Sequence, residues 1–326
     1  MLTFAGSKTI GMKRLLSLLF LLAGLTAAHA QDVKLNRQHS FARHVPAGNY
    51  SGITHVGDDR YAIVDDKQPD GFYLFHIHIH PSSGKILDVR NEGFMASGQP
   101  GHDAEAIVYR PASNTLFISW EASSQVVEYK LDGHPTGRQL AVPDIFHHPS
   151  PNRGIEALAY DPQADCFWLT TESQLPADNA GSADSGCLRL QAFDGQTLQP
   201  SRECLYRMDA PRAKRKGRMH VKGVSAMTAL PDGRLMVLER ECFLPKRKLG
   251  AWAECRLYII DTRAKEVGKR LLAKWRTRNL RFANYEGMCL GPVLDDGRQV
   301  VVLVSDSQNQ YGSLLKDWFR TLIVRL

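Results

Sequence analysis

The 326-residue sequence lacks the short motifs that identify several large enzyme classes. It contains no G-x-S-x-G nucleophile elbow, no P-loop and no G-x-G-x-x-G fingerprint. An α/β-hydrolase, a P-loop nucleotide hydrolase and a Rossmann dehydrogenase are therefore disfavoured. Helical periodicity is nearly absent, and no C-x-x-C pair occurs, which disfavours a zinc or thioredoxin-type site.

The sequence also has only a small surplus of positive charge. The formal net charge is +7, and residues 1–30 contribute Lys8, Lys13 and Arg14 but no acid. Without these three charges the surplus falls to +4 on the remaining 296 residues. A surplus of this size gives no case for a nucleic-acid-binding protein.

The first 30 residues have the pattern of a secretory signal peptide. Lys13 and Arg14 precede the apolar run 15–25, which is followed by the small-residue site Ala28-His29-Ala30. The run is too short to span a bilayer, which needs roughly 20 residues. The sequence predicts cleavage after Ala30 and a periplasmic or extracellular mature protein with no membrane span. An uncleaved N-terminal anchor is the alternative.

All six cysteines lie in the part predicted to be exported. An even number of cysteines in an oxidising compartment favours disulfides. We expect local bridges Cys187–Cys204 and Cys242–Cys255, because each pair brackets a plausible hairpin, which leaves Cys166–Cys289 as the third pair. Buried free thiols are the alternative.

One unit occurs five times along the chain: a short apolar strand, a turn, and a second apolar strand that ends in an acid. The five copies span residues 50–66, 104–121, 155–172, 224–240 and 285–306. Further strand candidates lie between the copies, giving four strands per copy, as in a propeller blade. Ser51, Glu105, Glu156, Ser225 and Glu286 hold equivalent places at spacings of 54, 51, 69 and 61 residues, which suit propeller blades.

The sequence therefore predicts an all-β fold, a single five-bladed β-propeller over residues 31–326. The strand around 41–45 and the terminal strand 321–325 are expected to close the ring, since an open ring leaves an exposed sheet edge. Six blades remain possible because the 69-residue gap could contain a degenerate one. A β-sandwich or two separate β-domains would also fit a chain of short strands.

A small residue follows the equivalent position in every copy. The innermost strands of a propeller crowd together near its axis, and a small side chain permits their close approach. The five residues are Gly52, Ala106, Ala157, Ala226 and Gly287.

The acids of the repeat are expected to gather at the propeller axis, because equivalent repeat positions occupy equivalent radial positions. Glu105, Glu156 and Glu286 would then face one another around one mouth of the channel. The acids that end the second strands would form another tier: Asp65 or Asp66, Glu121, Glu172, Glu239 and Asp306.

Carboxylates crowded in this way stay ionised only beside a counter-charge. Oxygen ligands in a wide ring suit a hard cation such as Ca²⁺ rather than zinc. The candidate metal ligands are Glu105, Glu121, Glu172, Glu286, Asp306 and Asp65. The alternative is that each acid accepts hydrogen bonds from backbone amides at a blade corner.

The repeated unit resembles the esterase-like phytase family of secreted bacterial proteins. The matching stretches are residues 152–162 with 167–172, 224–230 with 235–240, and 284–288 with 303–306, and the resemblance covers roughly residues 45–326. It implies a β-propeller that hydrolyses a small-molecule phosphoester or ester by metal-assisted attack of water. Ser51 and Ser225 stand where the ring would otherwise carry acids, which weakens the case for a site holding several calcium ions.

Four residues are candidates for catalysis under this hypothesis: Glu156, Arg153, Arg240 and His102. Arg153 and Arg240 each adjoin a ring acid within a repeat, where arginine pairs with carboxylate or binds phosphate in a bidentate manner. His102 lies just before Glu105 and could act as an acid–base group.

The basic run 212–222 directly precedes the fourth inner strand, so its Arg218 and Lys222 are the candidates for binding an anionic substrate. A solvated loop is the alternative for the run. For the whole molecule the alternative is a non-catalytic propeller that binds a ligand or protein and uses its carboxylates structurally. A monomer is compatible with the sequence.

Overall fold

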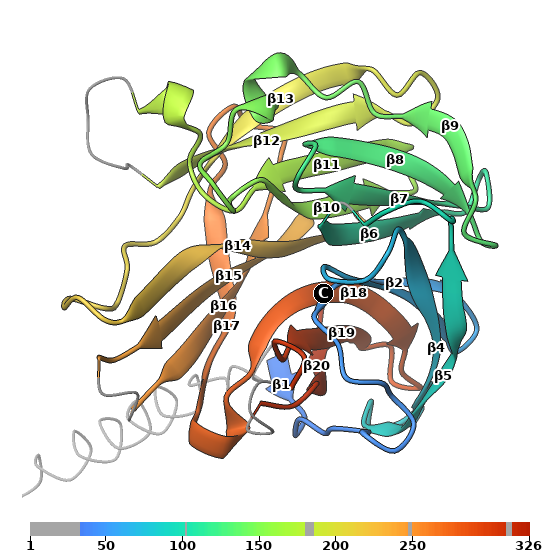
Figure 1. The fold of residues 1–326 in the computed structure, drawn as a ribbon, viewed down its shortest axis with the longest axis vertical. Helices are drawn as coiled ribbons and strands as arrows, with labels where there is room; N and C mark the ends of the chain where they lie inside the picture. The colour runs from blue at the N-terminus through green and yellow to red at the C-terminus, as the bar shows by residue number, and fades with distance from the viewer. Residues whose placement is uncertain (1–32, 102, 180–185, 247–249, 311–314) are drawn as a thin grey trace, which may run out of the picture.

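Short runs of β-branched, aromatic and aliphatic residues form the strands, and Asp-Gly, Asn and Pro positions form the turns between them. The computed structural model describes residues 33–101, 103–179, 186–246, 250–310 and 315–326. In this part of the chain twenty strands form five antiparallel sheets of four strands each. The sheets lie around a common axis as the blades of a propeller (Figure 1). The predicted five-bladed β-propeller is confirmed, and the predicted signal peptide lies outside the described residues.

Each of the first four blades is one continuous stretch of chain, with its strands in sequence order from the axis outward. The first blade contains β2 (Tyr50–Gly57), β3 (Arg60–Asp65), β4 (Gly71–Ile79) and β5 (Ile86–Ala96). The second contains β6 (Ala104–Arg110), β7 (Thr115–Trp120), β8 (Gln125–Lys130) and β9 (Pro135–Gln139). The third contains β10 (Ile155–Asp161), β11 (Cys166–Thr171), β12 (Cys187–Asp194) and β13 (Pro200–Arg207). The fourth contains β14 (Met219–Ala229), β15 (Leu235–Leu244), β16 (Trp252–Ile260) and β17 (Lys269–Arg278).

The fifth blade is built from both ends of the described chain. Its strands are β18 (Asn284–Val293), β19 (Gln299–Asp306), β20 (Phe319–Val324) and β1 (Val33–Leu35). Strand β1 pairs with β20 in antiparallel register, with Val33 opposite Val324. The expected closing strand at 41–45 is therefore wrong: this segment forms a turn, although Val45 is buried against the first and fifth blades.

Three single-turn 3₁₀-helices lie in the connections: η1 (Asp144–His147), η2 (Pro176–Asp178) and η3 (Asn279–Arg281). No helix of the described residues is long and apolar enough to cross a membrane.

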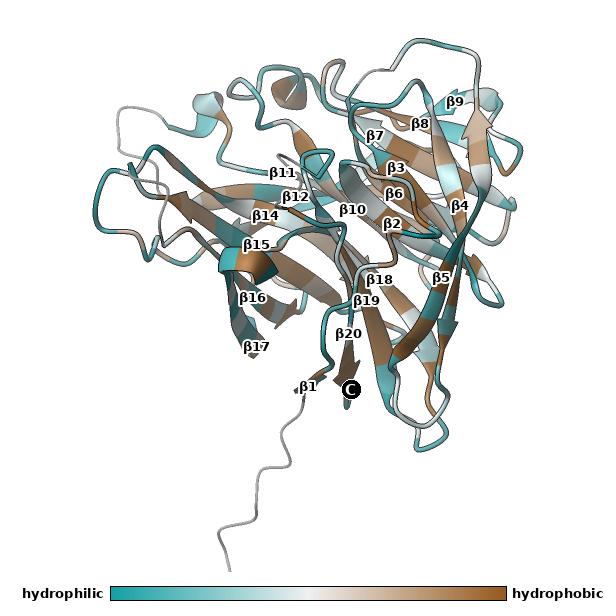
Figure 2. Ribbon diagram, turned by 60° about the horizontal axis from the view of Figure 1, so that its bottom comes forward, coloured by the Kyte–Doolittle hydropathy of each residue, from teal (hydrophilic) through white to brown (hydrophobic). Residues whose placement is uncertain are grey.

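The hydrophobic core lies between the blades. The buried residues form five clusters, and each cluster joins two neighbouring blades. Figure 2 shows the hydrophobic colour concentrated on the strands and the hydrophilic colour on the connecting loops. Because each face of a blade packs on its neighbour, the strands carry near-continuous apolar runs such as Val300–Val304, all fully buried. Blade-to-blade burial is therefore what holds the ring together.

The three expected disulfides are absent, because all six cysteines are free thiols. Cys242 lies opposite Ala253 and Cys255 opposite Arg240, so these two cysteines are offset by two residues on paired strands. Cys204 lies opposite Leu190, three residues from Cys187. Cys166 and Cys289 belong to the third and fifth blades, which are not neighbours in the ring.

The small residues of the inner strands meet at the axis, as expected. A Cβ atom on Gly52 would lie 2.9 Å from the Cα atom of Ala106 and 2.9 Å from the carbonyl oxygen of Glu105. A Cβ atom on Gly287 would lie 3.1 Å from the carbonyl carbon of Gly52. The cavity among these residues measures only about 10 Å³, so the propeller is closed at this level.

We expect Gly52→Ala to destabilise the protein by about 1–3 kcal/mol, because the added methyl group overpacks backbone atoms of the next blade. The measurement is urea unfolding followed by circular dichroism. Gly268→Ala is the matched control, since nothing lies within 4 Å of a Cβ atom at that position. Equal stabilities of the two variants would contradict this account of the axis.

Candidate active site

A β-bulge occurs at the same place in all five inner strands. In each blade, the register between the first and second strands shifts at the residue that was predicted to face the axis. A bulge leaves one residue unpaired and redirects its side chain. We call these five residues the bulge ring: Ser51, Glu105, Glu156, Ser225 and Glu286.

The strand register also identifies the matching positions on the second strands. The residue before each bulge pairs with Asp65, Trp120, Thr171, Glu239 or Ser305. The next residue along each second strand lies beside the bulge. We call these five residues the second ring: Asp66, Glu121, Glu172, Arg240 and Asp306.

This register replaces two of the expected second-tier residues. The carboxylate of Asp65 accepts hydrogen bonds from the backbone amides of Asn49 and Lys67, and Asp66 takes the place beside the bulge. Glu239 points between the third and fourth blades, where it accepts hydrogen bonds from the Tyr206 hydroxyl at 2.7 Å and the Lys269 amine at 2.6 Å. Neither Asp65 nor Glu239 belongs to the acid clusters described next.

Two overlapping clusters of carboxylates lie where the first three blades meet the axis. One carboxylate oxygen from each of Glu105, Glu121 and Glu156 lies within 4.8 Å of the others. The same spacing joins Glu105 to Asp66 and Asp103. Glu105 is shared by both clusters, and each cluster offers three carboxylates that could hold a hard cation.

Glu105 and Glu156 are the most buried members, with each residue 8% exposed. Among the described residues, no group donates a hydrogen bond to either carboxylate. Burial, reinforced by neighbouring carboxylates, raises the pKa of both groups well above the usual range. Asp66 has a buried oxygen, Oδ1, without a partner, and burial raises its pKa to about 6. This set of unpartnered oxygen atoms fits Ca²⁺, which takes carboxylate ligands in flexible arrangements.

A lysine at the rim of the clusters supplies part of the missing positive charge. The Lys67 amine lies 2.8 Å from Asp66 Oδ2 and 2.8 Å from Asp103 Oδ1. The Lys67 side chain is 62% exposed, so it is a solvated cap on the clusters rather than a buried counter-ion.

On the opposite side of the mouth, one second-ring position holds an arginine where the other blades have an acid. This arginine pairs with the neighbouring carboxylates. Arg240 is the second-ring residue of the fourth blade, and its guanidinium lies 2.6 Å from both Glu172 Oε1 and Glu286 Oε1. It also donates to Asn284 Oδ1 at 2.9 Å. Arg153 approaches the other oxygen of Glu172 at 3.2 Å. The two arginines predicted from the sequence therefore bind the same carboxylate from opposite sides.

The fourth blade extends beyond the ring on the side of the carboxylates. Strand β14 begins at Met219, six residues before its bulge, whereas β10 begins one residue before its bulge. Residues 219–223 pair with residues 240–244 and form a wall beside the mouth. Side chains alternate between the two faces of a strand, so the wall presents different residues to its two sides.

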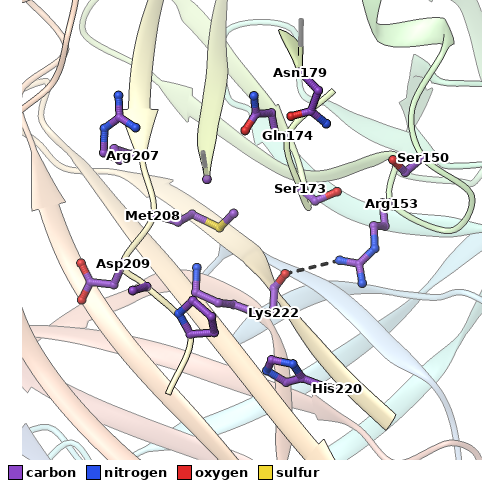
Figure 3. A pocket seen from close by; sticks show the side chains of 13 residues that line it. Ser150, Arg153, Ser173, Gln174, Asn179, Arg207, Met208, Asp209, His220 and Lys222 are labelled. Carbon is purple, nitrogen blue, oxygen red and sulfur yellow. Dashed lines mark hydrogen bonds between the residues drawn. The ribbon is translucent and has the colours of Figure 1, made fainter. Parts of the chain in front are cut away.

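A polar pocket of about 700 Å³ lies on one side of this wall (Figure 3). His220 and Lys222 face it from β14, and Arg153, Arg207 and Asp209 also line it. The Lys222 amine makes no hydrogen bond or ion pair within the described part of the chain, and burial lowers its pKa. With more cationic than acidic groups, the pocket suits an anionic ligand.

An apolar pocket of about 660 Å³ lies on the other side of the wall. Met219 and Val221 face it from β14, and its inner end reaches Arg240, Glu286 and Asp306. Arg218, a predicted substrate-binding residue, lies at this pocket, whereas Lys222 lies at the polar one.

The residues of the basic run 212–222 thus lie at several different sites around the fourth blade. Its start is fixed to the fourth blade, because the backbone amides of Arg212 and Ala213 donate to the Glu241 carboxylate at 2.8 Å. Arg212, Lys214 and Arg215 border a separate cavity of about 470 Å³. His102, predicted as an acid–base group, lies outside the described residues.

Sequence reasoning missed Asp103 and left Asp66 as one of two choices. Asp103 stands two residues before the bulge residue Glu105, and Asp66 directly follows Asp65, the last residue of β3. Gly154 was also missed, although its backbone amide donates to Glu121 Oε1 at 2.8 Å. The available signal was an Asn, Asp or Gly two residues before every bulge: Asn49, Asp103, Gly154, Gly223 and Asn284.

We expect Arg240→Met to destabilise the protein by about 3–5 kcal/mol, because it leaves the buried Glu172 and the partly buried Glu286 without their shared cation. Urea unfolding at pH 7 measures the loss. Arg234→Met is the control, since Arg234 pairs with an Asp232 side chain that is 50% exposed, and such pairs contribute about 0–1 kcal/mol. A similar small loss in both variants would contradict a structural role for Arg240.

We expect the EDTA-treated protein to lose stability as the pH rises from 5 to 8. Burial raises the pKa of Asp66 to about 6 and raises the pKa values of Glu105 and Glu156 well above their usual range. The folded protein therefore keeps protons that the unfolded chain releases in this range, and stability falls with pH. Glu105→Gln should flatten the fall of the melting temperature, while Glu266→Gln, at an exposed site, should not. An unchanged pH dependence in Glu105→Gln would contradict this.

A comparison with known proteins identifies one matching family and several solved structures whose fold is distantly similar. Residues 45–308 match the phytase-like family, described as "Esterase-like activity of phytase". No curated protein matches the chain.

Three solved structures illustrate the fold similarity. The PQQ domain of pyranose dehydrogenase from Coprinopsis cinerea has a TM-score of 0.48 and 9% identity, covering 91% of this chain and 98% of that one. A luciferin-regenerating enzyme has a TM-score of 0.44 and 15% identity, covering 89% and 95%. A streptogramin B lyase has a TM-score of 0.39 and 12% identity, covering 89% and 98%. Similarities this distant say nothing about activity.

The family match spans most of the chain and includes all five bulge positions, whereas the structural similarities are distant. The chain therefore belongs to the phytase-like family.

Proposed function

We propose that the protein is an exported, metal-dependent hydrolase of small phosphoric or carboxylic esters. The observation that carries the proposal is the pair of buried carboxylates on Glu105 and Glu156, which lie close together and receive no hydrogen bond from any of the described residues. Such a pair is costly to bury unless a cation lies between its members. Glu121, Asp66 and Asp103 complete an all-oxygen ligand set suited to Ca²⁺.

A divalent cation at this site would supply an electrophile that polarises the ester oxygen and lowers the pKa of a bound water. The protein residues around it have separate tasks. Glu105, Glu121 and Glu156 would hold the cation, and Glu156 lies three residues after Arg153 and within electrostatic reach of Arg240. Asp66 and Asp103 form the second cluster around Glu105 and would offer further oxygen ligands.

Positive side chains next to the ring would bind the anionic part of a phosphoester. Arg153 lines the polar pocket while it contacts Glu172, and Lys222 brings an amine without a partner into the same pocket. Arg240 is a positioning residue in this scheme, because its guanidinium is already shared by Glu172 and Glu286. Glu172 and Glu286, which the sequence assigned to the metal, pair with Arg240 in this scheme. Asp306, also assigned to the metal, accepts hydrogen bonds from Asn284 and Gln308.

The test is hydrolysis of 4-nitrophenyl phosphate, bis(4-nitrophenyl) phosphate and 4-nitrophenyl acetate with Ca²⁺ or with EDTA. We expect Ca²⁺-stimulated release of nitrophenol and bound calcium by elemental analysis. Glu105→Gln and Glu156→Gln should each reduce the rate at least about 100-fold while the protein stays folded.

Glu203→Gln, on the outer strand of the third blade, is the control and should retain the rate. A protein that binds no divalent ion and hydrolyses none of the three esters would overturn the proposal and favour a non-catalytic propeller with structural carboxylates.

A further inference from the structure

The two faces of the fourth-blade wall differ in chemistry, and the apolar face has no assigned role. Residues 219–222 alternate between the two pockets. Met219 and Val221 point into the apolar pocket, and His220 and Lys222 point into the polar one. The paired strand repeats the pattern, since Leu244 lies opposite Met219 and Cys242 opposite Val221. Leu280 and Phe282, from the segment after β17, face these residues across the pocket.

Large apolar side chains are left in contact with water at this pocket. Leu280 is 74% exposed and Met219 is 44% exposed. Soluble proteins seldom leave neighbouring apolar groups exposed around a cavity unless a ligand or partner covers them. The volume of about 660 Å³ lies within the range of small-molecule pockets, about 300–1,000 Å³.

The charges at the inner end of the pocket argue against an anionic occupant there. Glu286 and Asp306 reach this end, and Arg240 is already paired with Glu172 and Glu286. Arg218 is the other cationic side chain that lines the pocket among the described residues. A group rich in phosphates would meet carboxylates and apolar walls, whereas an uncharged apolar group would bury the exposed side chains.

Each pocket is lined by one arginine of the mouth. Arg153 lines the polar pocket and Arg240 lines the apolar pocket, and both bind Glu172. A ligand bound at the mouth would therefore have the polar pocket on one side of the wall and the apolar pocket on the other.

We propose that the apolar pocket binds the hydrocarbon or aromatic portion of the ester, so that the substrate class is an amphiphilic ester rather than a compact polyanion. This inference rests on the proposed function for the ester bond, but the pocket itself can be tested by binding alone. It places specificity in the fourth-blade extension, apart from the carboxylates that hold the cation.

The experiment measures displacement of the neutral fluorophore N-phenyl-1-naphthylamine by two uncharged anilides of different chain length. We expect octananilide to displace the probe at a concentration at least tenfold lower than acetanilide, because its chain fills the apolar pocket. Neither anilide needs to be hydrolysed for this measurement.

The double variant Met219→Ser/Leu280→Ser should bring the two anilides to within about threefold of each other, because it removes apolar surface from the pocket rim. Both side chains are substantially exposed, so the fold should persist. The matched control is Leu271→Ser/Val293→Ser, which removes two exposed apolar side chains that do not line the pocket. The control should keep the tenfold preference.

Equal displacement by both anilides in the unmodified protein would overturn the inference. A preference that survives in Met219→Ser/Leu280→Ser would overturn it as well, since the chain would then bind elsewhere. If the preference behaves as expected while no ester is hydrolysed, the proposed activity fails and the apolar binding site stands. If 4-nitrophenyl acetate and octanoate are hydrolysed with equal KM values, the activity stands and the inference fails.

Discussion

The inner strands pack so closely at the propeller axis that only glycine or alanine fits there. This close packing crowds the carboxylates together at the mouth, and the site follows from this constraint. Each inner strand bulges at the same residue, which places a Ser or Glu side chain at one mouth of the ring. Close approach of the strands at Gly52 and Gly287 brings these residues together. Like charges at such distances need compensation, and the molecule compensates them differently on the two sides of the mouth.

On the side of the fourth and fifth blades the compensating charge belongs to the chain itself. Arg240 replaces an acid in the second ring and binds Glu172 and Glu286. On the side of the first three blades, no arginine or lysine in the described part of the chain pairs with Glu105 or Glu156. This asymmetry directs the proposed cation to one half of the mouth and leaves the other half as a rigid support. The extension of the fourth blade then divides the space above the mouth into a polar and an apolar pocket.

Much of this arrangement was accessible from the repeat alone. Glu105, Glu156 and Glu286 were predicted to face the axis because repeated residues occupy equivalent places, and the bulges confirm their equivalence. The choice between Asp65 and Asp66 could not be made from the sequence, because it depends on the register between β2 and β3, in which Asp65 pairs with Tyr50 just before the bulge at Ser51. The predicted disulfide Cys242–Cys255 also depended on strand register. It does not form because the two cysteines lie two residues out of register on neighbouring strands.

The sequence by itself determined the small residues at the axis and the acids of the bulge ring, since these depend on a local pattern repeated five times, and it favoured five blades while six remained open. Only the tertiary structure decided which strand closes the ring, since Val33 must meet Val324 from the far end of the chain. It also decided that Arg240 neutralises Glu172 and Glu286 and that two unlike pockets flank the mouth. These features arise where side chains from different blades meet. Their charges and volumes interact because the residues are close in space, although they are far apart in the sequence.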